Sequence, residues 1–339
     1  MKKNIALLIA FAFSLSSASA QAIHNLVDNG KISLRGLSVV DDRVVWVSGS
    51  SGTVGRSLDG GKSWEWTIVK GFEKRDFRDI EAFDGNRAIV IAVAEPANIL
   101  KTIDGGKSWQ TVFSDSAKGM FLDAIDFNSE NKEGIVVGDP LDGMIYMATT
   151  QNGGNNWIPV PIASRLKVNE GEAMFAASGS NVKLISHGGP SKMDIVLVTG
   201  GRKSRLFYNH YAIDLPIVQG KESTGANGID VWESRKGIIV GGDFAADSIT
   251  EGNCVLFELN GKINLTLPQA GPHGYRSGVA WLDSNRAISC GISGVDITND
   301  GGKTWKLVST EGYHVCKKAK AGSSVFLAGS HGRVSRLDW

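Results

Sequence analysis

The chain has 339 residues, of which 42% are hydrophobic, and carries 36 Lys and Arg against 35 Asp and Glu. Because basic and acidic residues nearly balance, the chain has no surplus of positive charge to neutralise phosphates. Nucleic acid is therefore not expected as a partner. The 42 glycines, together with few long helical periodicities, indicate an all-β chain with many turns.

The N-terminus, residues 1–20, has the pattern of a secretory signal peptide. Two lysines precede an apolar run from Ile5 to Phe13, and Ala18-Ser19-Ala20 forms a small-residue end. Cleavage before Gln21 removes both lysines and takes the formal charge from +1 to −1. No segment approaches about 18 consecutive apolar residues, so no membrane span is expected. We therefore expect a periplasmic or secreted protein with a single domain over residues 21–339.

A short pattern recurs four times along the chain. It reads SLDGGKSWEW at 57–66, TIDGGKSWQT at 102–111, TQNGGNNWIP at 150–159 and TNDGGKTWKL at 298–307. Its tryptophans, Trp64, Trp109, Trp157 and Trp305, lie 45, 48 and 148 residues apart, and the last interval is close to three units of about 49. A period of about 40–50 residues is typical of a propeller, in which each unit is one four-stranded blade. Two blades without a box are then expected between the third and fourth boxes.

A second repeat gives the number of blades. A marker residue at the entry of each inner strand is followed five positions later by an apolar or aromatic residue, and a β-branched run ending in a Gly or polar turn comes next. The seven markers are Arg35, Arg78, Leu122, Glu172, Asn227, Arg276 and His314. The chain is therefore predicted to form a seven-bladed β-propeller of four-stranded blades.

The last unit ends at Trp339 with room for three strands, and the segment Ile23 to Leu34 has no blade of its own. We expect this N-terminal segment to join the last blade as its outer strand. The ring would then close without an open strand edge.

The boxes are interpreted as structural turns between third and fourth strands. Asp59, Asp104 and Asp300 are placed to accept hydrogen bonds from turn amides and from the preceding hydroxyl, and Asn152 keeps an acceptor without the charge. The paired glycines supply unusual backbone angles, while each Trp packs into its blade and can donate its N–H.

These residues also carry a family resemblance. S/T-x-D-G-G-x-S/T-W is the Asp box, or bacterial neuraminidase repeat. Together with GSSGTVGRSLDGGKSW and GSHGRVSRL, it resembles the photosystem II stability/assembly factor family, whose fold is a seven-bladed propeller. For the photosynthetic members of the family, the resemblance implies a non-catalytic assembly chaperone that binds a membrane-protein subunit. Asp boxes also occur in sialidases, xyloglucanases and sorting receptors, so the box alone does not define a function.

A binding site is expected where the markers surround the mouth of the central funnel. Arg276, His314, Arg35 and Arg78 follow one another in blade order as a basic arc, with Glu172 across from it. Converging arginines match a carboxylate or sulfate, so an anionic, glycan or protein ligand is expected there. In the alternative reading, each arginine pairs with an acid of a neighbouring blade and holds the ring together. The longer loops add Glu95, Asp139, Asp142, Asp243 and Asp247 on the same face.

Three function classes follow. The favoured one is a monomeric, non-catalytic binding or assembly factor. A glycoside hydrolase of sialidase or xyloglucanase type is the alternative, with Glu172 and Asp123, or Tyr275, as candidate catalytic groups. Sialidases are six-bladed and carry an Arg-Ile-Pro motif that is absent here, and xyloglucanases use two propellers. An oxidoreductase is less favoured, because no cofactor signature appears.

The cysteines point to no metal site. Cys254, Cys290 and Cys316 lack C-x-x-C spacing, which argues against a zinc or thioredoxin-type site. No metal or cofactor is expected. Export would permit one disulfide, and Cys290 with Cys316 is the closer pair in sequence, but the odd count leaves at least one thiol free.

Overall fold

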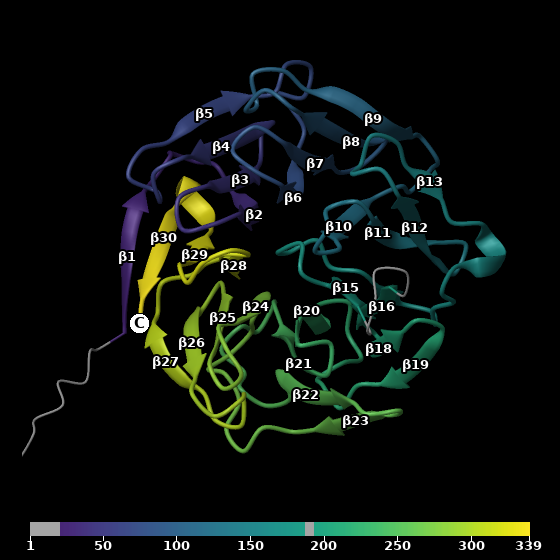
Figure 1. Cartoon of the computed structure of the whole chain (residues 1–339). Helices are drawn as coiled ribbons and strands as arrows, with labels where there is room; N and C mark the ends of the chain where they lie inside the picture. The colour runs from purple at the N-terminus through teal and green to yellow at the C-terminus, as the bar shows by residue number, and fades with distance from the viewer. Residues whose placement is uncertain (1–20, 187–192) are drawn as a thin grey trace, which may run out of the picture.

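A computed structural model describes residues 21–186 and 193–339 and arranges them as a ring of seven blades (Figure 1). Blade 1 contains β2 (Leu34–Val39), β3 (Val45–Gly49), β4 (Thr53–Ser57) and β5 (Glu65–Ile68). Blade 2 contains β6 (Phe77–Ala82), β7 (Ala88–Ala92), β8 (Ala97–Thr102) and β9 (Gln110–Asp115). Blade 3 contains β10 (Leu122–Phe127), β11 (Gly134–Leu141), β12 (Met144–Thr150) and β13 (Ile158–Pro159).

The second half of the ring repeats this order. Blade 4 contains β15 (Val182–Ser186), β16 (Met193–Val198), β18 (Arg205–Tyr208) and β19 (Tyr211–Asp214). Blade 5 contains β20 (Thr224–Trp232), β21 (Lys236–Asp243), β22 (Cys254–Leu259) and β23 (Ile263–Thr266), extended by β14 (Glu172–Ala173) and β17 (Gly200–Gly201). Blade 6 contains β24 (Gly278–Trp281), β25 (Ala287–Gly291), β26 (Gly294–Thr298) and β27 (Lys306–Ser309). Blade 7 contains β28 (Val315–Lys318), β29 (Val325–Ala328), β30 (Val334–Asp338) and β1 (Ala22–Val27), and two single turns, η1 (Ile162–Ser164) and η2 (Ser330–Gly332), complete the elements.

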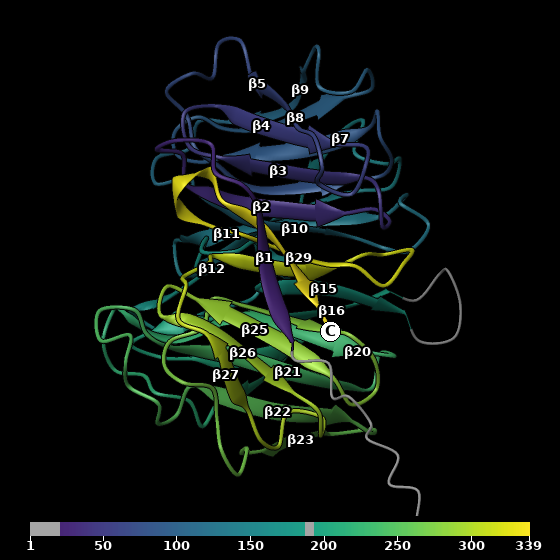
Figure 2. The same cartoon turned by 90° about the vertical axis from the view of Figure 1, so that its left-hand side faces the viewer.

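The predicted closure of the ring by the N-terminus is confirmed. β1 pairs antiparallel with β30, from Ala22 opposite Asp338 to Val27 opposite Val334 (Figure 2). β1 ends at Val27, whereas the predicted segment ran from Ile23 to Leu34. Leu34 is instead the first residue of β2. The N-terminal strand thereby covers the edge that β30 would otherwise expose.

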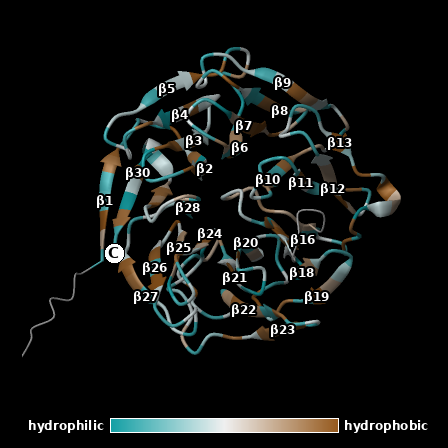
Figure 3. Ribbon diagram, in the orientation of Figure 1, coloured by the Kyte–Doolittle hydropathy of each residue, from teal (hydrophilic) through white to brown (hydrophobic). Residues whose placement is uncertain are grey.

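The core lies between the blades. Second strands such as β7, with the sequence AIVIA, are buried along their whole length, as expected for β-branched runs covered on both faces. Outer strands such as β1 and β5 are partly exposed, and β1 carries both hydrophobic and hydrophilic residues (Figure 3). Each blade therefore buries one sheet face against each neighbour.

The Asp boxes form the turns between third and fourth strands, as predicted. In the second box, Thr102 Oγ1 donates to Asp104 Oδ1 at 2.9 Å, and Asp104 accepts the Ser108 amide at 3.0 Å and the Ser108 hydroxyl at 2.6 Å. The Trp109 indole N–H donates to the Gly106 carbonyl at 3.1 Å. The first and fourth boxes repeat these contacts.

The third box differs from the others in its tryptophan. Asn152 keeps the acceptor role, because its Oδ1 accepts from Thr150 Oγ1 at 3.0 Å. The indole N–H of Trp157, however, is buried with no hydrogen-bond partner among the described residues, although the other three box indoles donate. Its ring packs edge-on against Phe127, with centroids 5.7 Å apart. In this box the Trp therefore acts through packing alone.

The marker residues do not all occupy one structural position. Arg35, Arg78 and Asn227 lie at a bulge where the inner strand slips by one residue against the second strand. Leu122 precedes the corresponding bulge, which falls at Asp123. In blade 4 the prediction is wrong, because Glu172 lies in β14, on the sheet of blade 5, whereas the inner strand of its own blade begins only at Val182.

The sequence also led to expectations about a signal peptide, membrane spans and the cysteines. The predicted signal peptide, residues 1–20, lies outside the described residues. Within the described part of the chain, no helix has the length and apolar character needed to cross a membrane. All three cysteines are buried and have free thiols.

Candidate functional site

A segment that leads into blade 4 crosses the central channel of the ring. Residues 175–180, here called the plug, precede β15, and the chain there reaches toward the centre of the ring (Figure 1). Ser178 Oγ donates to the Ser277 carbonyl of blade 6 at 2.6 Å. Arg35 of blade 1 donates to the Ala177 carbonyl at 3.3 Å. Contacts from blade 4 to blades 1 and 6 place the plug across the channel.

Gly179 of the plug touches Asp79, a side chain that belongs to the other end of the channel. A Cβ atom at Gly179 would lie 2.1 Å from the carboxyl carbon of Asp79, and the glycine has a φ of +59°. Only glycine fits this close approach without strain. The plug therefore separates an upper pocket, on the side of the strand entries, from a lower cavity on the side of the Asp boxes.

The upper pocket has a volume of about 510 Å³ and is the funnel that the sequence predicts. Strand entries and the loops between second and third strands line it. Its polar lining consists of Arg35, Arg78, Asp123, Asp139, Asn227, Tyr275, Ser277 and His314. The structure thus brings together five of the predicted site residues, namely Arg35, Arg78, His314, Asp123 and Tyr275.

The two guanidinium groups of the pocket retain unused donors. Arg35 makes one hydrogen bond, to the plug carbonyl, and no ion pair among the described residues. Arg78 Nη1 lies 3.5 Å from the Ala176 carbonyl, and its Nη2 lies 3.4 Å from Asp76, whose side chain is 42% exposed. Arg78 Nε is buried without a partner in the described structure. Burial, and next the adjacent Arg78, lower the pKa of Arg35, because two like charges share one desolvated site.

His314, beside the two arginines, is held in its neutral form. Burial, followed by the charges of Arg35 and Arg78, lowers the pKa of His314 to about 3. Its Nε2 lies 3.2 Å from Ser33 Oγ and 3.1 Å from Ser330 Oγ. Neutral His314 therefore adds no positive charge to the pocket at neutral pH.

Burial also favours the neutral form of the Asp123 carboxyl group. It is buried, and neither of its oxygens has a hydrogen-bond partner among the described residues. Burial, and secondarily the nearby Asp139, raise its pKa well above the usual value. Burial likewise raises the pKa of Asp139 to about 6, although this carboxylate accepts the Met174 amide at 3.2 Å. The pocket at neutral pH is thus positive at the arginines and negative at Asp139.

Tyr275 has a structural partner in the pocket wall. Its hydroxyl donates to Asn227 Oδ1 at 2.8 Å, and burial raises its pKa. A phenol held in this way stays protonated and is a poor nucleophile at neutral pH.

Arg276 is not part of the pocket, which corrects the predicted basic arc. Its side chain has no exposed surface, and its Nε donates to Asp296 Oδ2 of β26 at 2.7 Å. The guanidinium also donates to the Tyr275 and His273 carbonyls at 2.8 and 2.9 Å. The alternative prediction, in which each arginine pairs with an acid and stabilises the ring, therefore holds for Arg276. The acid belongs to the same blade, however, and not to a neighbouring one.

Glu172 does not face the arginines either. Arg205 donates to it through Nε at 2.9 Å and through Nη2 at 2.7 Å, and the Glu172 side chain is fully buried. Glu172 also accepts from the amide of Asn169 at 2.8 Å. All of these contacts anchor the chain that leads to the plug, so Glu172 is structural and cannot pair with Asp123 across the pocket.

Sequence reasoning missed the apolar side of the pocket. Phe175 of the plug packs edge-on against Phe244 at 5.9 Å, and Phe244 against Tyr275 at 6.2 Å. Phe244 and Ile292 remain 45% and 44% exposed at the rim. These residues lie in the plug and in loops, where no strand periodicity marks them. In the described chain, no group of three or more His, Cys, Asp or Glu side chains is arranged to hold a metal ion.

Comparisons with known proteins agree with the Asp-box resemblance. Residues 65–190 match the family model for the photosynthesis system II assembly factor YCF48. YCF48 bound to a D1 peptide is similar in structure, with a TM-score of 0.63, 17% identity and coverage of 95% of this chain and 98% of that one. YCF48 from Cyanidioschyzon merolae has a TM-score of 0.60 and 18% identity over 94% and 99% of the two chains. No curated protein matches by sequence.

A glycoside hydrolase shares the architecture as well. The GH74 enzyme of Niastella koreensis has a TM-score of 0.59 and 13% identity over 92% of this chain and 53% of the enzyme chain. At this identity the likeness shows the fold alone. The resemblance to the photosystem II assembly factor family is thus confirmed, with the family match at residues 65–190 and the propeller fold from Ala22 to Asp338.

Proposed function

We propose that this chain is a non-catalytic binding propeller that acts as an assembly or stability factor for a protein partner. The observation that carries the proposal is the pair Arg35 and Arg78, which direct unused donors into one pocket beside an exposed apolar rim. Two guanidiniums match a carboxylate by paired charge-assisted hydrogen bonds. The rim residues Phe244 and Ile292 would contact apolar side chains of the same segment. The expected ligand is an acidic peptide segment of a protein.

The comparisons support a protein partner. YCF48 has been solved with a D1 peptide bound, and residues 65–190 match its family. The proposal includes export to the periplasm or outside the cell, on the basis of the signal-peptide pattern at residues 1–20.

The test is peptide binding with matched variants. Fluorescence anisotropy would compare acidic peptides with their amide counterparts, in which Gln or Asn replaces the acid. We expect Arg35→Met and Arg78→Met each to weaken binding of the acidic peptides by about 2–5 kcal/mol, while Arg87→Met, which changes an exposed arginine paired with Asp84, has no effect. Equal binding of acidic and amide peptides would overturn the proposed role of the arginines.

A glycosidase is the second candidate, and one observation favours it. Asp123 and Asp139 line the same pocket, and both have a raised pKa. Glycosidases use two carboxyl groups with different pKa values as acid and base or nucleophile. Release of reducing sugar from xyloglucan or from sialylated glycans, abolished in Asp123→Asn and Asp139→Asn, would support this function over the binding role.

A further inference from the structure

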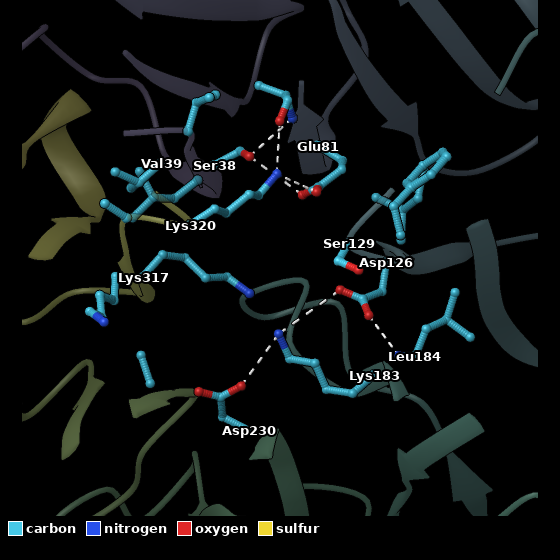
Figure 4. A pocket seen from close by; sticks show the side chains of 18 of the residues that line it. Ser38, Val39, Glu81, Asp126, Ser129, Lys183, Leu184, Asp230, Lys317 and Lys320 are labelled. Carbon is cyan, nitrogen blue, oxygen red and sulfur yellow. Dashed lines mark hydrogen bonds and ion pairs between the residues drawn. The ribbon is translucent and has the colours of Figure 1, made fainter. Parts of the chain in front are cut away.

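The lower cavity is a second, separate hollow on the opposite side of the plug. It has a volume of about 670 Å³, within the range of small-molecule sites. Charged side chains of five inner strands surround it, and most are labelled in Figure 4. Four lie on the inner strands β10, β15, β20 and β28, namely Asp126, Lys183, Asp230 and Lys317, and the fifth is Glu81 on β6.

One side of this cavity has more carboxylates than cations. Lys183 Nζ lies 3.5 Å from Asp230 Oδ1 and 3.9 Å from Asp126 Oδ1. Two carboxylates thus share a single ammonium group. Their other oxygens accept the Leu184 and Trp281 amides at 2.7 Å each, so both carboxylates are held in place.

Lys317 reaches the same cavity from the inner strand of blade 7, β28. Lys317 makes no hydrogen bond or ion pair with any described residue, although its ammonium group points into the cavity (Figure 4). The inner strands next to it contribute the uncharged residues Ser38 and Ala280. Glu81 is already paired with Lys320, which also donates to the Ala82 carbonyl at 2.7 Å.

Asp79 does not supply the missing charge. Its two oxygens accept the Ile80 and Ile125 amides at 2.8 and 3.0 Å. Burial raises its pKa to about 8, so the carboxyl group is mostly protonated at pH 7. Lys317 therefore has no carboxylate at ion-pair distance among the described residues. Burial, followed by the charge of Lys183, lowers the pKa of Lys317, while the charges of Asp79, Asp230 and Asp126 oppose this shift.

We propose that the lower cavity binds a small zwitterion, with its carboxylate on Lys317 and its ammonium group at Asp126 and Asp230. A simple anion would approach Lys317 but would also face the carboxyl groups of Glu81, Asp126 and Asp230. A simple cation would face Lys183 and Lys317. A ligand with both charges and no net charge can contact groups of both signs. The indole rings of Trp232 and Trp281, whose centroids lie 6.5 Å apart, add apolar wall for the carbon chain of an amino acid.

Calorimetry or thermal-shift titration of the purified protein tests the proposal. The probes are glycine, 4-aminobutyrate and 6-aminohexanoate, with butyrate and butylamine as single-charge controls. We expect saturable binding of at least one zwitterion, and binding of butyrate and butylamine that is weaker by about tenfold or more, because each loses one charged contact. Absence of saturable zwitterion binding, or equal binding of butyrate, overturns the proposal.

Variants locate the ligand. Lys317→Met and Asp230→Asn should each weaken zwitterion binding by about tenfold or more, with folding checked by circular dichroism. Arg35→Met, in the upper pocket, should leave it unchanged, which separates this site from the proposed peptide site. Unchanged binding in a folded Lys317→Met protein would also overturn the assignment. The wild-type probe series keeps the proposal testable if a variant fails to fold.

Discussion

Arg276 and Asp296 form an ion pair inside blade 6 in which both side chains have no exposed surface. Arg276 Nε donates to Asp296 Oδ2 at 2.7 Å, and His273 Nδ1 lies 2.6 Å from Asp296 Oδ1. The arginine joins the strand entry of β24 to the third strand of the same blade. Because its charge is paired with Asp296 inside the blade, Arg276 cannot bind a ligand.

Removing the arginine should destabilise the protein strongly. Arg276→Met leaves Asp296 buried without its main cationic partner, and we expect the free energy of unfolding to fall by about 3–5 kcal/mol. Urea denaturation followed by circular dichroism measures the change. The double variant Arg276→Met/Asp296→Leu should recover part of the loss, because neither member of the pair remains. A single variant as stable as the wild type would contradict this role.

The Asp boxes should make the protein sensitive to acid. Hydrogen bonds from the Ser63 and Ser108 side chains and amides lower the pKa values of Asp59 and Asp104 from 3.8 to about 2. Since the folded-state pKa is depressed, this stabilisation is complete above about pH 4 and is lost as the pH falls toward 2. We expect Asp59→Asn/Asp104→Asn to flatten the thermal stability profile between pH 4 and 2.

The third box provides the control for that experiment. It already holds Asn152 in the Asp position, with the same acceptor contact to Thr150 at 3.0 Å. Asn152→Asp should therefore steepen the acid loss of stability. An unchanged slope in both variants would mean that the box carboxylates do not contribute to acid unfolding.

The ring could be predicted from the sequence because its repeats depend on local turn chemistry. Asp104, Gly106 and Trp109 act within one turn, so their spacing survives in the sequence. The orientation of strand-entry side chains depends instead on register. Arg276 lies two residues before Gly278, which pairs with Cys290, whereas Arg35 lies one residue before the equivalent Gly36, which pairs with Ser48. Neighbouring side chains point in opposite directions along a strand, so Arg276 turns into the blade.

The plug and the charges of the cavities could not be predicted in the same way. Residues 175–180 belong to an insertion between blades 3 and 4 and contact blades far away in sequence, as Ser178 does with Ser277. The five-residue spacing from Glu172 to Ala177 matched the inner-strand pattern by chance. Long-range pairing of this kind leaves no periodic signal in a single sequence.

His314 should make the protein less stable as the pH falls below about 6.5. Burial lowers its pKa from 6.5 to about 3, so the unfolded chain binds a proton there more readily than the folded protein does. The folded state therefore loses stability as the pH falls from about 6.5 toward 3. We expect His314→Gln to lose less stability than the wild type over this interval, by up to about 1.4 kcal/mol per pH unit. Thermal melts from pH 7 to pH 4 measure the difference, and parallel curves would refute it.

Glu172 and Arg205 should control the plug without touching a ligand. Glu172→Gln removes the charge from a buried bidentate contact, and we expect a loss of about 2–3 kcal/mol in stability. Hydrogen exchange should rise at residues 172–180, because Glu172 anchors the chain that enters the plug. Peptide binding in the upper pocket should weaken as its floor loosens. Arg205→Lys should also raise the exchange of this segment above the wild-type level, since a single ammonium group cannot make both contacts.

A catalytic Glu172 would behave differently: Glu172→Gln would abolish glycan hydrolysis while stability and hydrogen exchange stayed at the wild-type level.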